Sequence, residues 1–190
     1  MSKFGLKDSL FIRGEVPMTK SEVRAITISK LQLQPNDVVV DIGAGSGSIT
    51  VECALTCELG TVYAIEKKVK AINILRQNIK KFKLKNCTLI EGEAPSNLPQ
   101  VDINKAFIGG SGGQLVSIFN WLKNNLYSQG IVVANCISLE NTINIINLFK
   151  QYHYDNIDIT QVSIAKGKPI AELTLMMAQN PIYIISAQKQ

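Results

Sequence analysis

The chain has 190 residues, of which 46% are hydrophobic and 18% are charged. These values are typical of a soluble globular protein, and we expect residues 1–190 to form a single domain with a sizeable core. Residues 1–11 mix charged and apolar positions, which is unlike a secretory signal, and no apolar run is long enough to span a bilayer. We therefore expect a cytoplasmic enzyme or binding protein with no membrane partner.

The net charge of +5 comes from one stretch of the chain. Eight basic and no acidic residues lie between positions 67 and 85, so the remaining residues carry −3 once these eight are subtracted from +5. A basic surface can attract nucleic acid, but a single basic helix is more simply a solvated helix face. We expect no nucleic-acid partner.

The cysteines and the one histidine do not indicate a metal site or a catalytic triad. Cys53, Cys57, Cys87 and Cys136 show no C-x-x-C spacing, and a triad would have to use His153 in a polar stretch. Two of the cysteines lie four apart on an expected helix, but buried reduced thiols are favoured over ligands. We expect no metal.

The first ordered element is expected to be a helix that begins after a loop. Residues 13–18 contain glycine and proline, and Thr19 is followed three residues later by Glu22, the spacing of a capping box. We expect Thr19 to cap a helix that ends near Leu33, with any ligand contact in addition.

Strands and helices then alternate along the chain. The expected strands are 37–42, 61–66, 87–91, 105–108, 131–135, 157–164 and 171–186, and the expected helices are 46–58, 69–82, 114–125 and 139–151. This order predicts an α/β fold with a mostly parallel seven-stranded sheet, an antiparallel C-terminal hairpin at one edge and helices on both faces.

The most informative stretch is residues 38–50. An apolar β-branched run is followed by Asp41 and then by glycines at positions 43, 45 and 47. Glycine lets the backbone turn sharply or approach a ligand where a Cβ would interfere. Such a turn after the first strand of an open α/β sheet is where a nucleotide-like cofactor binds.

The spacing of this turn favours S-adenosylmethionine over a dinucleotide. The dinucleotide fingerprint is G-x-G-x-x-G, and position 48 is not glycine. Asp41 would repel a pyrophosphate, but it suits the ammonium and sulfonium groups of S-adenosylmethionine, whose carboxylate the backbone N–H groups of the turn can receive. The predicted cofactor-binding residues of the turn are Asp41, Gly43, Ala44, Gly45, Ser46 and Gly47.

Two further acidic residues follow neighbouring strands. Glu66 ends the second strand, where a carboxylate can accept hydrogen bonds from both ribose hydroxyls. Glu93 and Ala94 follow the third strand and are expected to line an adenine pocket. Each acid alone could be an ordinary solvated or helix-terminal charge, but three sites at the ends of three successive strands support one another.

Four stretches of the chain resemble the class I S-adenosylmethionine-dependent methyltransferases. More closely, they resemble the precorrin and cobalt-precorrin C15-methyltransferases (decarboxylating) of cobalamin biosynthesis. These stretches are residues 10–20, 41–50, 91–95 and the Gly-Gly-Ser-Gly-Gly run at 109–113. The glycine turn is common to the whole superfamily, whereas the first and last stretches are typical of a much smaller group of proteins within it. The resemblance covers essentially the whole chain and implies a Rossmann-like methyltransferase fold.

This resemblance implies a cofactor site, a reaction and an assembly. The methionine part of S-adenosylmethionine would be held by Thr19 and residues 43–47, the ribose by Glu66 and the adenine by Ala94. The reaction would methylate C15 of cobalt-precorrin-6B and decarboxylate the acetate on ring C. The chain is the size of the stand-alone enzyme of the anaerobic route, and a homotetramer is implied. We identify no catalytic residue, because an enamine-like ring carbon needs no dedicated base.

Candidate contacts to a tetrapyrrole substrate are fewer. Glycines at 109–113 would let a flat macrocycle approach the methyl group, and their N–H groups could receive a carboxylate, although a flexible connector is the simpler alternative. The candidates in this loop are Gly109, Gly110, Ser111, Gly112 and Gly113. Arg13, Lys166 and Lys168 are further candidates, because we expect them in loops.

Two other function classes remain open from the sequence. An RNA or protein methyltransferase is favoured by the basic helix, but an amino-methylating enzyme would carry a D/N-P-P-Y-like motif where this chain has glycines. Asn180-Pro181-Ile182-Tyr183 is similar to that motif but lies in the terminal strand. A non-catalytic nucleotide-binding module would bind NAD instead of S-adenosylmethionine.

Overall fold

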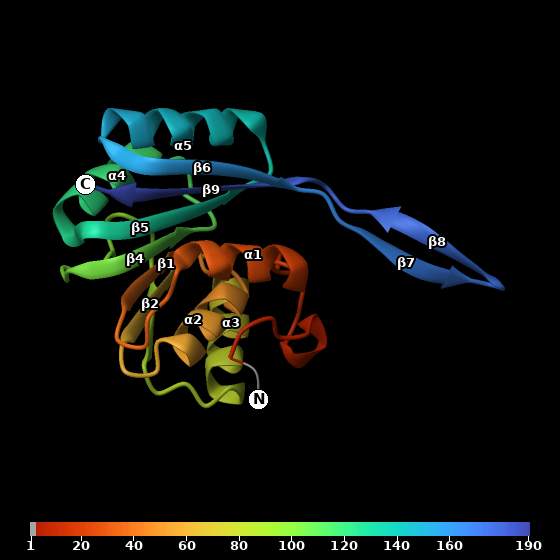
Figure 1. Ribbon diagram of the computed structural model, residues 1–190. Helices are drawn as coiled ribbons and strands as arrows, with labels where there is room; N and C mark the ends of the chain where they lie inside the picture. The colour runs from red at the N-terminus through yellow and green to blue at the C-terminus, as the bar shows by residue number, and fades with distance from the viewer. Residues whose placement is uncertain (1–2) are drawn as a thin grey trace.

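The computed structural model describes residues 3–190, and its main part is a seven-stranded sheet between two layers of helices (Figure 1). The helices are α1 (Ser21–Leu31), α2 (Ser48–Thr56), α3 (Val69–Lys81), α4 (Leu115–Asn125) and α5 (Leu139–Gln151). The strands are β1 (Val38–Ile42), β2 (Thr61–Glu66), β3 (Cys87–Glu91), β4 (Ile103–Ile108), β5 (Leu126–Cys136), β6 (Tyr154–Val162), β7 (Ala165–Ile170), β8 (Leu173–Ala178) and β9 (Ile182–Lys189).

The strand order of the main sheet is β3-β2-β1-β4-β5-β9-β6. Strands β1 to β5 pair in parallel, whereas β9 runs antiparallel between β5 and β6. This confirms the predicted mostly parallel sheet with antiparallel C-terminal strands at one edge. The chain order reverses between β1 and β4, and ligands bind at the carboxyl ends of strands at such a switch point.

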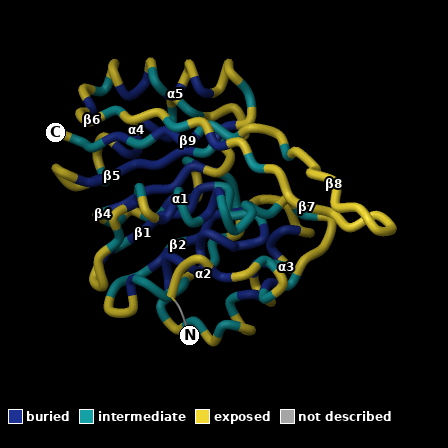
Figure 2. The backbone as a smooth tube through the Cα atoms, turned by 45° about the vertical axis from the view of Figure 1, so that its right-hand side comes forward, coloured by how far each residue is buried: buried dark blue, intermediate teal, exposed yellow. Residues whose placement is uncertain are grey.

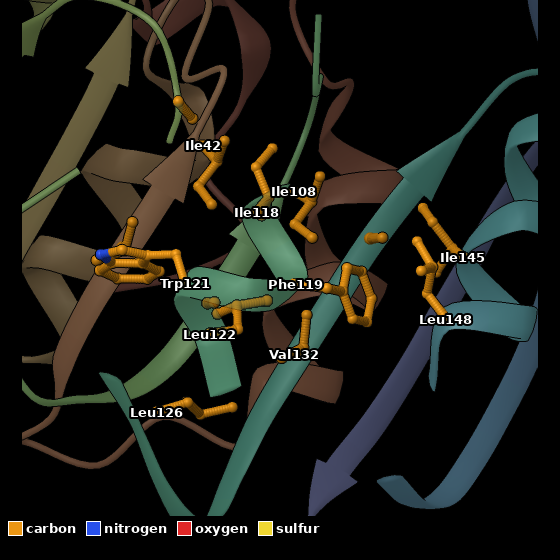
Figure 3. Packing of buried hydrophobic residues seen from close by; sticks show 14 of the residues in the cluster. Ile42, Ile108, Ile118, Phe119, Trp121, Leu122, Leu126, Val132, Ile145 and Leu148 are labelled. Carbon is orange, nitrogen blue, oxygen red and sulfur yellow. The ribbon is translucent and has the colours of Figure 1, made fainter. Parts of the chain in front are cut away.

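Both faces of the central strands β1 and β4 are largely buried, as the continuous apolar run of the first strand predicts. Successive residues of one strand face opposite layers: Val39 packs with residues of α1 and α2, and Val40 packs with residues of α4 and α5. Figure 3 shows the second of these layers, in which Phe119 and Leu122 from α4 lie close to Val132 of β5.

The free thiols of Cys53, Cys57 and Cys136 are buried, and Cys87 is partly buried.

The first helix begins differently from the prediction. α1 begins at Ser21 after Lys20, and no side chain caps it, so the predicted capping box of Thr19 and Glu22 is wrong. The carbonyl of Thr19 instead accepts a hydrogen bond from Arg24, and Glu22 pairs with Lys166. The helix begins one residue later than a Thr19 cap requires, so Lys20 precedes the first turn, and the Glu22 carboxylate pairs with Lys166 and not with the cap.

The buried face of the basic helix α3 also differs from the prediction. The apolar pattern of this helix predicts that Val69 is buried, but Val69 is the first residue of α3 and is 71% exposed. The polar Asn78 is fully buried on the same helix. Strand β5 is longer than the predicted strand 131–135, because Leu126 already pairs with Ile103 of β4.

The C-terminal strands extend beyond the main sheet. The two strands predicted at 157–164 and 171–186 form four, and β7 and β8 make a separate antiparallel hairpin that projects from the body (Figure 1). Every residue of this hairpin is exposed (Figure 2). Within residues 3–190, no helix combines the length and apolar character needed to cross a membrane.

Candidate functional site

A cavity of about 310 Å³ lies where the carboxyl ends of β1 to β4 meet. Its wall consists of the loops that follow these strands together with part of the N-terminal segment. These residues include Val16, Pro17, Thr19, Gly43, Ala44, Gly45, Ser46, Glu66, Lys67, Lys68, Gly92, Glu93, Ala94, Gly109, Gly110, Ser111 and Gly112. The cavity therefore contains eight of the ten predicted cofactor-binding residues, without Asp41 and Gly47.

The glycine turn is held tightly between two neighbouring strands. The backbone N–H groups of Gly43 and Ala44 donate to the carbonyl of Ile65 at 2.9 and 3.0 Å. A Cβ on Gly43, where φ is +75°, would lie 2.6 Å from the carbonyl oxygen of Gly110. Gly47 precedes α2 with a φ of 79°. Glycine is therefore required for the turn to lie against the loop after β4.

Glu66 fixes the turn from the end of β2. Its Oε2 accepts a hydrogen bond from the Gly45 N–H at 2.8 Å, and its Oε1 accepts from the N–H groups of Lys67 and Lys68 at 2.9 Å each. A carboxylate has about four lone-pair sites, two on each oxygen, so Oε2 keeps one site that can accept a ligand hydroxyl. Glu66 lies in the cavity wall, and its contact with a ribose stays a prediction.

Asp41 lies behind the turn and not in the cavity wall. Its side chain is fully buried, Oδ2 accepts a hydrogen bond from Thr50 Oγ1 at 2.5 Å, and Oδ1 has no hydrogen-bond partner among residues 3–190. Burial raises the pKa of this carboxyl to about 7, although the Thr50 hydrogen bond lowers it, and the charge of Glu66 raises it slightly. A contact between Asp41 and a bound ammonium stays a prediction.

An ion pair forms part of the cavity wall. Lys67 Nζ lies 2.5 Å from Glu93 Oε1, and both side chains are about half exposed. A Cβ on Gly112 would lie 2.9 Å from Glu93 Oε1 and 3.0 Å from Lys67 Nζ. The pair thus connects the loop after β2 with the loop after β3, and Gly112 of loop 109–113 lies against it, while Ala94 is buried.

A buried arginine holds the N-terminal segment that passes the cavity. The Arg24 side chain is fully buried, pairs with Glu52 at 2.5 Å and donates from Nη1 to the carbonyl of Thr19 at 2.6 Å. Glu52 also accepts hydrogen bonds from the N–H groups of Gly5 and Leu6. The sequence analysis did not predict this network. The one signal for it in the sequence is Glu52, an acidic residue within the apolar helix 48–56.

Asn78 joins the same segment to the glycine turn. Its Nδ2 donates to the carbonyls of Ile12 at 3.1 Å and Ser46 at 2.9 Å, and its Oδ1 accepts from the Ile12 N–H at 2.8 Å. The prediction overlooked Asn78, although its position three residues after Leu75 places it on the buried face of α3.

A second cavity, of about 560 Å³, adjoins the first. The two cavities share Pro17, Thr19, Phe107, Gly109, Gly110 and Ser111. Its other lining residues are mainly apolar or carry amides, namely Met18, Lys20, Val23, Ile108, Leu115, Asn135, Cys136, Ile137, Asn141, Ile145, Gln179, Asn180 and Ile182. No Asp or Glu is among them. The cavities could therefore hold two ligands that meet at residues 109–111.

The remaining candidate contacts lie elsewhere. Gly113 lines neither cavity but lies beside a groove next to α5. Arg13 is exposed and lines none of these three depressions. The expectation that Lys166 and Lys168 lie in loops is wrong, because both lie in β7, where backbone pairing forms the hairpin. Lys166 Nζ pairs with Glu22 at 2.8 Å.

The strand order, the glycine turn and the ligand-sized cavity at the switch point define a Rossmann-like methyltransferase fold. Residues 10–189 match the family model described as the precorrin methyltransferase domain, and the chain belongs to this family. The resemblance seen in the sequence is thereby confirmed.

Individual relatives match over nearly their whole length. The chain is 43% identical over 190 residues to a "probable cobalt-precorrin-6B C(15)-methyltransferase (decarboxylating)" of Saccharolobus solfataricus, covering 97% of this chain and 96% of the relative. The crystal structure of a precorrin-6y C5,15-methyltransferase from Geobacter metallireducens is 36% identical, with a TM-score of 0.93 and coverage of 99% and 98%. A precorrin 8W decarboxylase from Methanobacterium thermoautotrophicum is 34% identical, with a TM-score of 0.90 and coverage of 96% and 98%.

Proposed function

We propose that this chain transfers a methyl group from S-adenosylmethionine to C15 of cobalt-precorrin-6B and removes the ring C acetate carboxylate as carbon dioxide. The observation that carries the proposal is the pair of cavities that meet at residues 109–111. One is of cofactor size, and the other is larger and has no acidic lining residue, which suits a substrate with several carboxylates. Membership of the precorrin methyltransferase family supports the same activity.

The residues of the smaller cavity fit S-adenosylmethionine. Ser46 Oγ is buried without a hydrogen-bond partner among residues 3–190, so it can donate to the methionine carboxylate beside the turn N–H groups. Glu66 would accept from a ribose hydroxyl through Oε2, Ala94 would contact the adenine, and Thr19 would contact the methionine part. A cavity of about 310 Å³ falls within the range usual for small-molecule sites. When bound, this cofactor supplies an electrophilic methyl group.

The contribution of the protein to methyl transfer is mainly positioning. Arg24 and Asn78 hold the segment that carries Thr19 against the glycine turn, and this fixes one wall shared by both cavities. Loop residues 109–110 have no side chain between the cavities, so a ring carbon can approach in line with the transferred methyl. In the decarboxylation, the bond from the acetate methylene to the carboxylate breaks, and its electron pair passes into the macrocycle as carbon dioxide leaves.

Incubation with cobalt-precorrin-6B and S-adenosylmethionine, followed by mass spectrometry, tests this activity. The expected product has gained one methyl group and lost one carbon dioxide. Methylation of tRNA in its place would favour the alternative, an S-adenosylmethionine-dependent RNA or protein methyltransferase. Calorimetric binding of NAD but not of S-adenosylmethionine would contradict both.

We also propose that the protein does not bind nucleic acid and that it works in the cytoplasm as one domain of residues 1–190. Three cations of the basic stretch have acidic partners. These pairs are Lys67 with Glu93, Lys70 with Glu15 at 2.9 Å, and Arg76 with Glu91. Helix α3 packs on β3 at the sheet edge, away from the larger cavity. Salt-dependent tRNA binding at micromolar affinity would contradict this.

A homo-oligomer, and by family resemblance a tetramer, completes the proposal. The hairpin β7–β8 supports self-association, because its apolar side chains are 46% to 69% exposed. These are Ile170, Leu173, Leu175, Met176 and Met177. Two exposed strands with apolar side chains form a surface that another chain can cover.

A further inference from the structure

The larger cavity does not end at the sheet but continues along helix α5. A groove of about 560 Å³ lies between loop 109–113 and α5, and it shares Ser111, Leu115 and Asn141 with the larger cavity. The groove also shares Ser111 and Gly112 with the smaller cavity, so the three depressions meet at loop 109–113. We call the smaller cavity the cofactor cavity and the larger one the acceptor cavity. We call the groove itself the amide groove, and its amide side chains are Asn141, Asn144, Asn147 and Gln151.

The spacing of these amides places them along one side of α5. Steps of three, three and four residues keep side chains on the same face of a helix. All four residues are exposed, and within residues 3–190 their side-chain amides make no hydrogen bond. Figure 2 shows α5 alternating between buried and exposed segments. These N–H groups are therefore available to a ligand.

The charge pattern of the groove differs from that of an ordinary solvated helix face. Helix α5 has two charged residues, Glu140 and Lys150, and neither lines the groove. No Asp or Glu lines the groove or the acceptor cavity, where Lys20 is the one charged lining residue. Each amide offers two N–H donors, which form charge-assisted hydrogen bonds with carboxylate oxygens.

We propose that the amide groove binds peripheral carboxylate side chains of the acceptor while its macrocycle occupies the adjoining cavity. The proposal rests on the proposed function, because it requires an acceptor with several carboxylate arms. Asn141, shared by the cavity and the groove, receives the arm nearest the macrocycle. Asn144 and Asn147 receive an arm that extends along α5. These residues determine substrate affinity and take no part in the chemistry.

Neutral donors suit a reaction in which a carboxylate is lost. A lysine or arginine in the groove would also attract the ring C acetate, and it would stabilise this reacting carboxylate more than the transition state, in which the carboxylate charge moves into the macrocycle. An amide orients the arms with less of this ground-state stabilisation. The groove therefore provides recognition without opposing decarboxylation.

The test replaces two amides by carboxylates, in a double variant of Asn144→Asp and Asn147→Asp. Each change removes a donor and adds a negative charge next to the substrate arm, so the KM for cobalt-precorrin-6B should rise at least about ten-fold. The kcat and the Kd for S-adenosylmethionine should stay within about two-fold, because neither residue lines the cofactor cavity. Asn144→Gln with Asn147→Gln keeps the donors and should restore a KM close to that of the wild type.

The matched control is Asn36→Asp with Asn73→Asp, which adds the same charge at exposed positions outside the three depressions. If the Asn144→Asp, Asn147→Asp variant has the same KM as this control, the groove does not bind the acceptor, and the proposed function is unaffected. A changed oligomeric mass would also contradict acceptor binding in the groove, because the face would then be an interface. If the wild type binds S-adenosylmethionine but does not convert the tetrapyrrole, the proposed function and the groove both fail.

Discussion

At the residue scale, two neighbouring carboxylates at the glycine turn have very different surroundings. Glu66 accepts three backbone hydrogen bonds and lines the cofactor cavity. Asp41 lies behind it, fully buried, with one hydroxyl donor from Thr50. Burial of a carboxylate without enough donors favours its protonated form. The two acids therefore serve different purposes, which the sequence could not distinguish because both end apolar strands.

Replacement of Asp41 by Asn should flatten the pH dependence of stability. The pKa of about 7 in the folded state exceeds the ordinary value of 3.8, so the folded protein holds a proton that the unfolded chain releases. This raised pKa makes the free energy of unfolding fall as pH rises from about 4 to about 7. The variant has no such loss. The free energy of unfolding of Asp41→Asn, taken relative to that of the wild type, should therefore increase by about 2–3 kcal/mol from pH 5 to pH 8. Urea denaturation at both pH values measures the difference, and a constant difference would contradict this account.

Replacement of Glu66 by Gln should weaken S-adenosylmethionine binding about 10- to 100-fold. One oxygen becomes an amide donor that faces backbone N–H groups, and a charge-assisted hydrogen bond to the ribose is lost. Calorimetry measures the affinity. Glu93→Gln is the matched control, because that half-exposed carboxylate pairs with Lys67 and a smaller loss is expected. Equal losses in the two variants would argue against a ribose contact.

At the scale of elements, the N-terminal segment depends on buried polar contacts over long sequence separations. Arg24 connects it with α2 through Glu52, and Asn78 connects it with α3 and the glycine turn. Such side chains stabilise a fold only while all their partners are present, because an unpaired buried group is costly. The wall of the cofactor cavity is thus coupled to the folding of the first 20 residues.

The variant Asn78→Ala should lower the free energy of unfolding by at least about 2 kcal/mol, because it leaves the N–H and carbonyl of Ile12 and the carbonyl of Ser46 without a partner. Urea denaturation measures this change. S-adenosylmethionine affinity should fall as well, since the turn loses a support. Asn73→Ala, at an exposed position of the same helix, should cost less than about 0.5 kcal/mol. Indistinguishable behaviour of the two variants would refute the anchoring role.

Much of the element order could be predicted from the sequence. Strands β2 and β3 and helix α5 have the predicted bounds, because apolar periodicity and punctuating residues agree there. The capping box was wrong because α1 begins at Ser21, after Lys20, and because the Glu22 carboxylate pairs with the distant Lys166. Arg24 and Asn78 were missed because the partners that allow their burial are distant in sequence.

The hairpin β7–β8 shows a second limit of sequence reasoning. Its residues 173–178 are mainly apolar, so they were expected to belong to the main sheet. Apolar composition indicates that a surface is to be covered, but not whether the same chain covers it. Since the sequence did not predict this hairpin, it also did not predict that Lys166 and Lys168 lie in a strand.

At the scale of the whole molecule, the projecting hairpin predicts an assembly that charge can disrupt. Leu173 and Leu175 lie on one face of β8 and are 69% and 46% exposed. The double variant Leu173→Glu with Leu175→Glu should reduce the oligomeric mass in sedimentation, because burying carboxylates in an apolar interface is unfavourable. Lys168→Glu in the same hairpin is the charge control. An unchanged mass for the double variant would exclude the hairpin as an interface.

In the proposed reaction, one chain carries out both methyl transfer and decarboxylation on a tetrapyrrole. The most direct measurement uses S-adenosylmethionine with an isotope-labelled methyl group and cobalt-precorrin-6B labelled in the ring C acetate carboxylate. The account predicts labelled methyl at C15, detected by NMR, and labelled carbon dioxide released in equal amount. Methyl transfer without release of labelled carbon dioxide, or no methyl on the macrocycle at all, would contradict it.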